Sequence, residues 1–177
     1  DDDINFEYRS RYYALFVDYC LVAQSQFIPS YERDGLDNAI DFLTPGNTSI
    51  FIPLDIEKKY DVSFIGQPLE SRVEIIRFLK SKGVRVNIWG HGWGKYPEFK
   101  EEYGGSLNTD EMIEVINQSK INLGFTKNQY GDPHFKGRFF EVGGCKAFQL
   151  IDYFEEYKKY LKEGEEIIMF RDKEDLL

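Results

Sequence analysis

The side chains best suited to chemistry stand together in a short segment of mixed charge, the sequence KGRFFE at residues 136–141. Lys136 and Arg138 lie where a loop is expected to enter a short helix, at about residues 137–145, ahead of an apolar strand. The free backbone N–H groups and the dipole at a helix N-terminus attract phosphate, and neighbouring cations add to that attraction. About one turn further on, the carboxylate of Glu141 can accept hydrogen bonds from two sugar hydroxyls. The segment therefore predicts a site for a nucleoside diphosphate and its ribose.

Two loops of the same region contain glycines that suit close contact between the backbone and a ligand. One follows the apolar run at residues 62–65, and the other, with three glycines in five residues, follows the run at 84–89. In an open parallel sheet, ligands lie beyond the carboxyl ends of the strands, where both loops stand. The alternative interpretations are that the glycines form turns without a ligand, that His91 is a structural residue and that Trp93 packs in the core or at its rim. The predicted contacts are Gly66, Gln67, Gly90, His91, Gly92 and Trp93.

Apolar runs alternate with amphipathic segments from residue 60 onward, which is typical of alternating strands and helices. The sequence predicts strands at 62–65, 84–89, 121–125, 147–151 and 167–170, and helices at 69–82, 108–118, 137–145 and 153–161. Asn108 and Glu111 have the spacing of a capping box, and Gly83 is a suitable helix stop. Strands that alternate with helices imply right-handed crossovers and a parallel sheet. The predicted fold class is therefore α/β, with a Rossmann-like parallel sheet flanked by helices.

The first part of the chain, residues 1–59, lacks this alternation. Strands are predicted there at 12–16 and 19–23, followed by a segment of mixed character at 31–42. The chain starts without methionine and ends on what resembles the first turn of a helix. We therefore expect a small N-terminal remnant before the α/β domain, within a longer enzyme.

The composition limits the possible partners. The 177 residues carry a formal net charge of −9, which argues against a nucleic-acid partner, because such a protein needs a basic face to neutralise phosphates. No apolar run approaches the roughly 20 residues that span a bilayer. The cysteines, Cys20 and Cys145, stand far apart, so reduced thiols in a cytoplasmic protein are expected. No His/Asp cluster has metal-ligand spacing, so no metal site is predicted.

The segment from Lys136 to Asp152 resembles the donor-binding half of GT-B glycosyltransferases, in the group 1 branch that includes the spore-maturation (CgeB-like) proteins. That branch has the pattern K-x-R-x-F-E, a few small residues, a strand and an aspartate. The resemblance extends over about residues 60–177. It includes the sequences DVSFIG at 61–66, IWGHGW at 88–93, SKINLGF at 119–125 and GEEIIMFRD at 164–172.

The resemblance implies that residues 60–177 bind a nucleotide-sugar donor and that residues 1–59 are the tail of the acceptor-side domain with the crossover. It implies transfer of a sugar from a nucleotide-diphosphate donor to an unknown glycan, protein or small-molecule acceptor, with no cofactor and no essential metal. Lys136 and Arg138 would offset the charge of the departing diphosphate, and Glu141 would hold the ribose. Arg72 matches the arginine of the family's G-x-x-x-x-x-R pattern, which implies a phosphate contact, and a solvated helix arginine is the alternative interpretation.

One departure from the family pattern keeps alternatives open. Related retaining enzymes have a second glutamate eight residues before the position of Glu141, and here that position is Pro133. Sugar recognition and the stereochemical outcome are therefore not predicted. A non-catalytic nucleotide-sugar-binding module is one alternative, and an unrelated doubly wound signalling or flavin-binding domain is another.

Overall fold

The computed structural model describes residues 6–43 and 45–177, and the chain divides into two compact units after Pro45. Residues 46–59 belong to the second unit by their contacts. The Leu54 N–H donates to the Asn117 Oδ1 at 2.8 Å, and Phe51 packs against Ile116. The observed division after Pro45 lies earlier in the chain than the domain boundary expected at residue 60. The assignment of residues 1–59 to an acceptor-side domain stays a prediction.

The first unit contains two short parallel strands and short helices. Its elements are a π-helical turn at Phe6–Ser10, α1 at Arg11–Ala14, β1 at Cys20–Val22, a 3₁₀ helix at Ser25–Phe27, α2 at Ile28–Arg33 and β2 at Ala39–Asp41. The strand predicted at 19–23 is confirmed as β1, but the one predicted at 12–16 is wrong. The π-helical turn leads there directly into α1, in which Ala14 is buried while Tyr12 and Tyr13 are both exposed.

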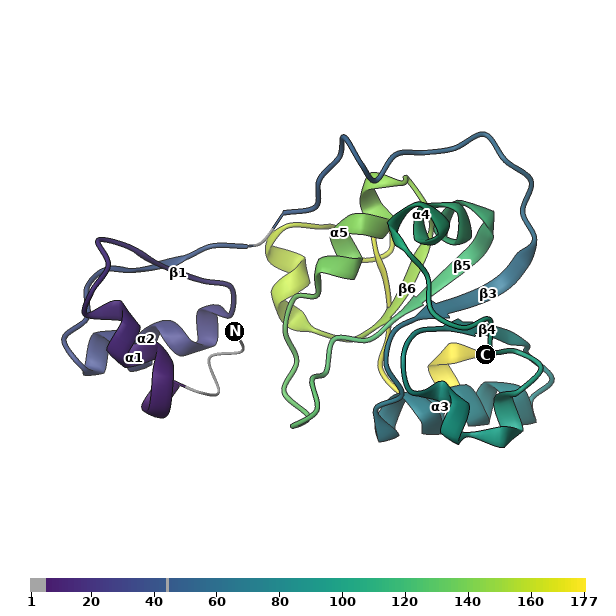
Figure 1. Cartoon of the computed structure of the whole chain (residues 1–177), viewed down its shortest axis with the longest axis horizontal. Coiled ribbons are helices and arrows are strands. Elements are labelled where there is room, and N and C mark those ends of the chain that lie inside the picture. The colour runs from purple at the N-terminus through teal and green to yellow at the C-terminus, as the bar shows by residue number, and fades with distance from the viewer. Residues whose placement is uncertain (1–5, 44) are drawn as a thin grey trace. The chain divides into compact units, whose positions relative to one another are not determined.

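The second unit is built on one five-stranded parallel sheet with helices on both faces, as Figure 1 shows. Its strands are β3 at Tyr60–Ile65, β4 at Val86–Trp89, β5 at Ser119–Gly124, β6 at Gln149–Asp152 and β7 at Ile168–Phe170. They lie in the order β4-β3-β5-β6-β7. The strand order therefore reverses beside β3, which leaves a crevice between the carboxyl ends of β3 and β5. The predicted α/β, Rossmann-like fold is confirmed.

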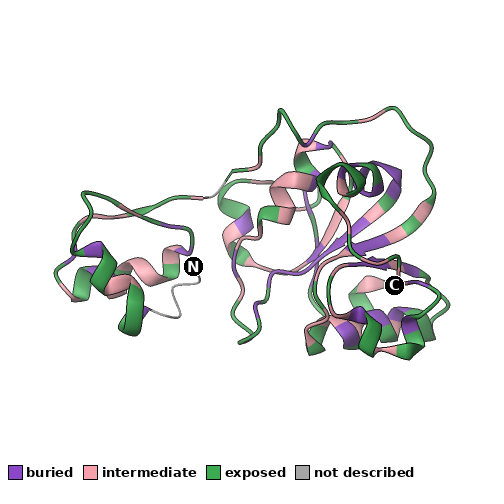
Figure 2. Ribbon diagram, in the orientation of Figure 1, coloured by how far each residue is buried: buried purple, intermediate pink, exposed green. Residues whose placement is uncertain are grey.

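The two faces of the sheet have separate apolar cores, because successive strand residues point to opposite sides. Phe64 packs with Val73 and Ile76 of α3, at Glu70–Ser81. Its neighbour Ile65 packs on the other face with Ile113 of α4, at Thr109–Gln118, and Val142 of α5, at Gly137–Gly144. Figure 2 shows buried residues along the central strands and helices that face the sheet. The helices predicted at 69–82, 108–118 and 137–145 are confirmed.

Local hydrogen bonds account for the start of α4. The Glu111 N–H donates to the Asn108 side chain at 3.0 Å, and the Asn108 N–H donates to the Glu111 carboxylate at 2.8 Å. This is the predicted capping box, which satisfies backbone donors that the first helical turn leaves without intrahelical partners.

The helix predicted at 153–161 is shorter and of a different type. A 3₁₀ helix spans Glu155–Lys159, and Tyr157 packs edge-on against Phe135 at 4.5 Å between ring centroids. The aromatic packing replaces the longer amphipathic helix that the pattern predicted. Further 3₁₀ helices lie at Trp93–Lys95, Pro97–Phe99 and Glu174–Leu176.

Candidate functional site

A cavity of about 240 Å³ lies between the sheet and the N-terminus of α5, at the carboxyl ends of β3 and β5. It therefore stands at the crevice where the strand order reverses, the usual ligand position in open α/β sheets. Its polar lining includes Arg72, Lys136, Arg138, Thr126 and Gln149. Its apolar and backbone lining comes from Phe64, Ile65, Leu123, Gly124, Phe125, Gly137, Phe139, Ile151 and Tyr157. Cationic side chains predicted from separate parts of the sequence thus meet at one cavity.

The N-terminus of α5 borders this cavity. Lys136 is the residue before the helix and has an extended backbone, with φ −105° and ψ 138°, and Gly137 begins the helix. Among the residues that the structure describes, no side chain caps the first turn of α5. The positive end of the helix dipole is therefore directed toward the same space as the side chains of Lys136 and Arg138.

Arg138 extends from the first turn of α5 toward α4. Its Nη1 donates to the Glu141 Oε2 at 2.7 Å and also contacts the Met112 sulfur. Burial lowers the pKa of Arg138, and the nearby Glu141 carboxylate opposes that shift. Within the described part of the chain, the buried Arg138 Nε has no hydrogen-bond acceptor. An unpaired buried donor is costly.

Arg72 connects the two loops that flank the crevice. Its Nη1 donates to the Gln67 carbonyl at 3.1 Å and its Nη2 to the Lys127 carbonyl at 3.0 Å. Its guanidinium lies 6.0 Å from the ring centroids of both Phe64 and Phe125. Burial lowers its pKa, and the charge of Asp152 opposes that shift. Its Nε, like that of Arg138, is buried without an acceptor among the described residues.

Lys136 contacts a histidine that sequence analysis left without a role. Its Nζ lies 2.6 Å from the Nε2 of His134, which is buried. The backbone of His134 donates to the Thr126 carbonyl at 3.2 Å. Alternate residues of an extended segment point to the same side, so the i, i+2 spacing of His134 and Lys136 was the signal available in the sequence.

Two further ionisable side chains lie near the cavity, and sequence analysis assigned no role to either. At the end of β6, the Asp152 Oδ1 accepts from the Thr126 N–H at 2.5 Å, and burial raises the pKa of that carboxyl group. Burial also raises the pKa of Tyr157, which hydrogen-bonds to the backbone of Lys136. Both residues therefore hold backbone that lines the cavity.

The loop residues predicted as ligand contacts do not line this cavity. The Trp93 side chain is fully buried, and its Nε1 donates to the Gly66 carbonyl at 2.7 Å. Gly90 has φ +130°, and a Cβ there would lie 2.4 Å from the Gly66 oxygen. The glycines thus permit close packing of the two loops, and Trp93 is a core residue with no face for a sugar.

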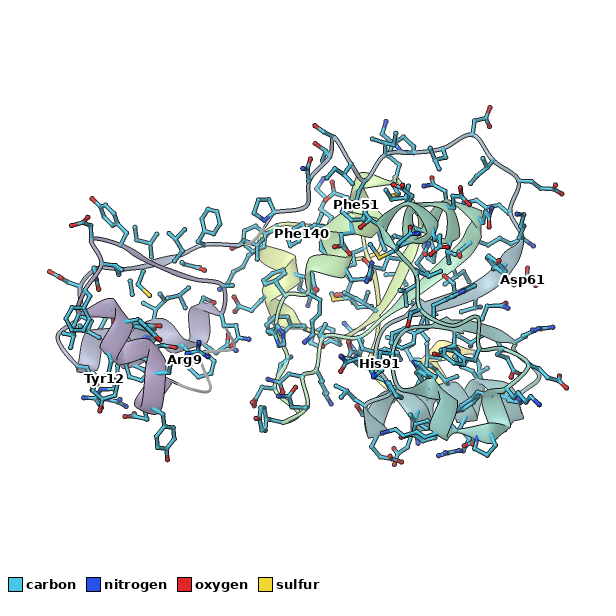
Figure 3. All side chains as sticks on the ribbon, in the orientation of Figure 1. Arg9, Tyr12, Phe51, Asp61, His91 and Phe140 are labelled. Carbon is cyan, nitrogen blue, oxygen red and sulfur yellow. The ribbon has the colours of Figure 1, made fainter. Side chains whose placement is uncertain are left out.

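The other predicted contacts have different surroundings. His91, labelled in Figure 3, is exposed, and the neighbouring Gly92 has φ +97° beside the ring of Pro68. Gln67 contributes its carbonyl to Arg72. Glu141 is paired with Arg138 and lies outside the set of cavity-lining residues. Ligand contacts by these residues stay predictions.

Two kinds of feature are absent from the described ranges, 6–43 and 45–177. No group of three or more His, Cys, Asp or Glu side chains is arranged there to hold a metal ion. None of the helices in those ranges has the length and apolar character required to cross a membrane.

Comparison with known proteins agrees with the fold. The model of the family described as "Glycosyl transferase-like" matches residues 72–177, more than half of the chain, including all the cavity's cations. The chain is 25% identical to "Spore protein CgeB" of Bacillus subtilis (strain 168) over 141 residues, which cover 69% of this chain and 44% of that protein. It thus spans less than half the length of this relative. The chain belongs to the glycosyl transferase-like family, as a CgeB-like domain of the GT-B type.

Proposed function

We propose that the cavity binds the diphosphate of a nucleotide-sugar and that the protein transfers the sugar to an acceptor. The observation that carries this proposal is the convergence of Arg72, Lys136 and Arg138 on one cavity beside the N-terminus of α5. A diphosphate matches these groups in charge, and it supplies acceptors for the buried Nε atoms of both arginines. Family membership supports glycosyl transfer in general.

The proposed chemistry is electrostatic. When the bond between the anomeric carbon and the diphosphate oxygen breaks, the electron pair leaves with the diphosphate, and Lys136 and Arg138 stabilise the charge that develops there. Arg72 contacts the phosphates from the opposite side of the crevice. The Glu141 Oε2 accepts from Arg138, so we assign its other oxygen, Oε1, to the ribose hydroxyls. The oxygen of the acceptor hydroxyl, on a glycan, protein or small molecule, then forms the new bond to the sugar, and its proton passes to the departing diphosphate.

These cations neutralise the leaving group without a metal or a cofactor in this proposal. We place the reaction in the cytoplasm, a location supported by the free thiols of Cys20 and Cys145.

Titration calorimetry with nucleoside diphosphates and the matching nucleosides tests the phosphate site. We expect the diphosphate to bind at least about tenfold more tightly, because each charge-assisted hydrogen bond contributes roughly 1.5–3 kcal/mol. Lys136→Met and Arg138→Met should each remove much of that difference. Lys120→Met is the matched control, since Lys120 is exposed and pairs with Asp61 at the other end of the sheet. Equal affinities for nucleoside and diphosphate would contradict the proposal.

A non-catalytic nucleotide-sugar-binding module is the second candidate. It is favoured by Pro133 at the position of the family's other glutamate and by the ion pair that partly neutralises Arg138. Mass spectrometry can follow release of the nucleoside diphosphate from a panel of nucleotide-sugars, with and without a mixture of glycan acceptors. Release that depends on Lys136 supports an enzyme, whereas tight binding without release supports the module.

A further inference from the structure

The loop between β5 and α5 has a shape fixed by its own hydrogen bonds. Lys127 and Pro133 form an antiparallel bridge at its base, and the side chain of Asn128 accepts from the N–H groups of Tyr130 and Asp132 at 2.9 and 3.0 Å. Asn128 is itself buried. This loop therefore delivers the next residue, His134, at a defined position beside the cavity.

His134 is held on both its backbone and its ring. Its N–H donates to the Thr126 carbonyl at 3.2 Å, and its buried ring has Nε2 at 2.6 Å and Nδ1 at 3.3 Å from the Lys136 Nζ. A lysine ammonium can only donate, so the nearer ring nitrogen must be an acceptor. Acceptance at Nε2 corresponds to a neutral imidazole with its proton on Nδ1.

An ordered partner matters for Lys136 because a lysine side chain is long and flexible. Fixing such a side chain costs conformational entropy, and binding energy from a ligand must otherwise offset that cost. The backbone of Lys136 is already held by α5 and by the hydrogen bond with Tyr157. The contact with His134 extends that order to the ammonium group, which lines the cavity.

We propose that His134 is a positioning residue, whose neutral imidazole holds the Lys136 ammonium in the cavity, ready to meet the diphosphate. The inference rests on the proposed function and deepens it by assigning a role to a residue outside the family motif. Gln can replace the Nε2 acceptor with its amide oxygen, but Ala cannot, and Gln does not titrate.

Protonation of His134 should release the contact. An imidazolium has no acceptor nitrogen, and its charge repels the ammonium of Lys136. The other charged or titratable groups of the surrounding elements are Asp132 and Lys127 on the same loop, Arg72 and Arg138 at the cavity, Glu141 paired with Arg138, Asp152 at the end of β6, and Tyr157. Because none of these is a second histidine, the histidine-dependent part of the pH response belongs to His134.

The first experiment uses no ligand. The ¹⁵N chemical shifts of the His134 ring, measured at about pH 8, identify which nitrogen carries the proton. We expect the proton on Nδ1 and a bare Nε2. A proton on Nε2 would overturn the proposed contact, whatever the protein binds.

The second experiment measures nucleoside diphosphate affinity by calorimetry from about pH 5.5 to about 8.5 in the wild type, His134→Gln and His134→Ala. At the upper end, Gln should stay within about threefold of the wild type and Ala should bind about three- to tenfold more weakly, as expected for one lost hydrogen bond. Toward the lower end, the wild type should lose more affinity than the Gln variant. The Gln variant also measures the background from titration of the ligand's own phosphate.

The chain's other histidine supplies the comparison for the pH dependence. His91→Gln should keep the wild-type pH response, whatever its own effect on affinity. Equal affinity of the wild type and the Ala variant would overturn the proposal, with tryptophan fluorescence used to confirm that each variant is folded. Tighter wild-type binding at low pH would make the imidazolium a direct phosphate ligand instead. If the wild type binds no diphosphate, the proposed function fails, while the ring shifts still decide the contact between His134 and Lys136.

Discussion

Arg138 and Glu141 form an ion pair across one turn of α5, with 2.7 Å between Nη1 and Oε2. Both side chains are partly buried, at 30% and 24% exposure, so the pair is more than a solvated surface contact. Two residues predicted to bind separate parts of a nucleotide are therefore coupled to each other. Any assignment of Glu141 to the ribose must account for this pair.

Replacement of Glu141 by Gln separates its two possible roles. If Oε1 accepts hydrogen bonds from the ribose, Glu141→Gln should lower the affinity for a nucleoside diphosphate about tenfold, because an amide is a weaker acceptor than a carboxylate. The 2′,3′-dideoxy analogue should lose much less, since it has no hydroxyl to donate. Calorimetry with both ligands decides between the roles. A similar loss for both would leave Glu141 as a structural partner of Arg138 and remove the ribose assignment.

Replacement of Arg72 by Lys should weaken phosphate binding and loosen the crevice. Lysine keeps the charge but cannot reach the Gln67 and Lys127 carbonyls together with a fixed planar group. We expect diphosphate affinity to fall about tenfold or more, with little change in nucleoside affinity. Arg77→Lys is the matched control on the same helix, where Arg77 is exposed and pairs with Glu98. Equal effects of the two substitutions would rule out a specific role for Arg72.

Replacement of Gly90 by Ala should destabilise the second unit strongly. The added Cβ combines a φ of +130° with a 2.4 Å approach to the Gly66 oxygen, so we expect a loss on the order of 3 kcal/mol in the free energy of unfolding. Gly83→Ala provides the control, because Gly83 has φ +81° but open space around it, and should cost only about 1 kcal/mol. Urea denaturation followed by fluorescence reports on this unit, since Trp89 and Trp93 both flank Gly90. Equal losses would show that loop packing at Gly90 relaxes.

Replacement of Asp152 by Asn should raise stability near neutral pH. Burial raises the pKa of Asp152 above its ordinary value of 3.8, so the folded state holds this proton more tightly than the unfolded chain. Ionisation of Asp152 therefore reduces wild-type stability as the pH rises above about 3.8, and below that value the reduction is absent. Asn keeps an acceptor for the Thr126 N–H and does not ionise.

The measurement for Asp152 is the free energy of unfolding of both proteins as a function of pH. The advantage of Asp152→Asn at neutral pH should disappear on acidification through the window above 3.8. A variant that is instead less stable at neutral pH would show that attraction between Asp152 and Arg72 outweighs the cost of burying the carboxylate.

The sequence alone determined the order and type of most elements after residue 60, because the interactions that define them are local. The capping box of Asn108 and Glu111 joins residues three apart, and the strands are short apolar runs bounded by polar or glycine residues. The same locality explains why Lys136 and Arg138 could be predicted to lie close together, since both belong to one motif at the start of α5. The fold class followed from the alternation of these elements.

The tertiary structure decided which of these residues meet. Arg72 follows β3 and Arg138 lies in α5, and the placement of β5 directly beside β3 brings them to one cavity. The same non-local packing buried Trp93 under the loop of Gly66 and shortened the helix predicted at 153–161 around Tyr157. Long-range packing of this kind depends on which strands pair and which side chains fill the space between layers. A local pattern contains neither, and this is why the meeting of Arg72 with Lys136 and Arg138 at one cavity became visible only in the folded chain.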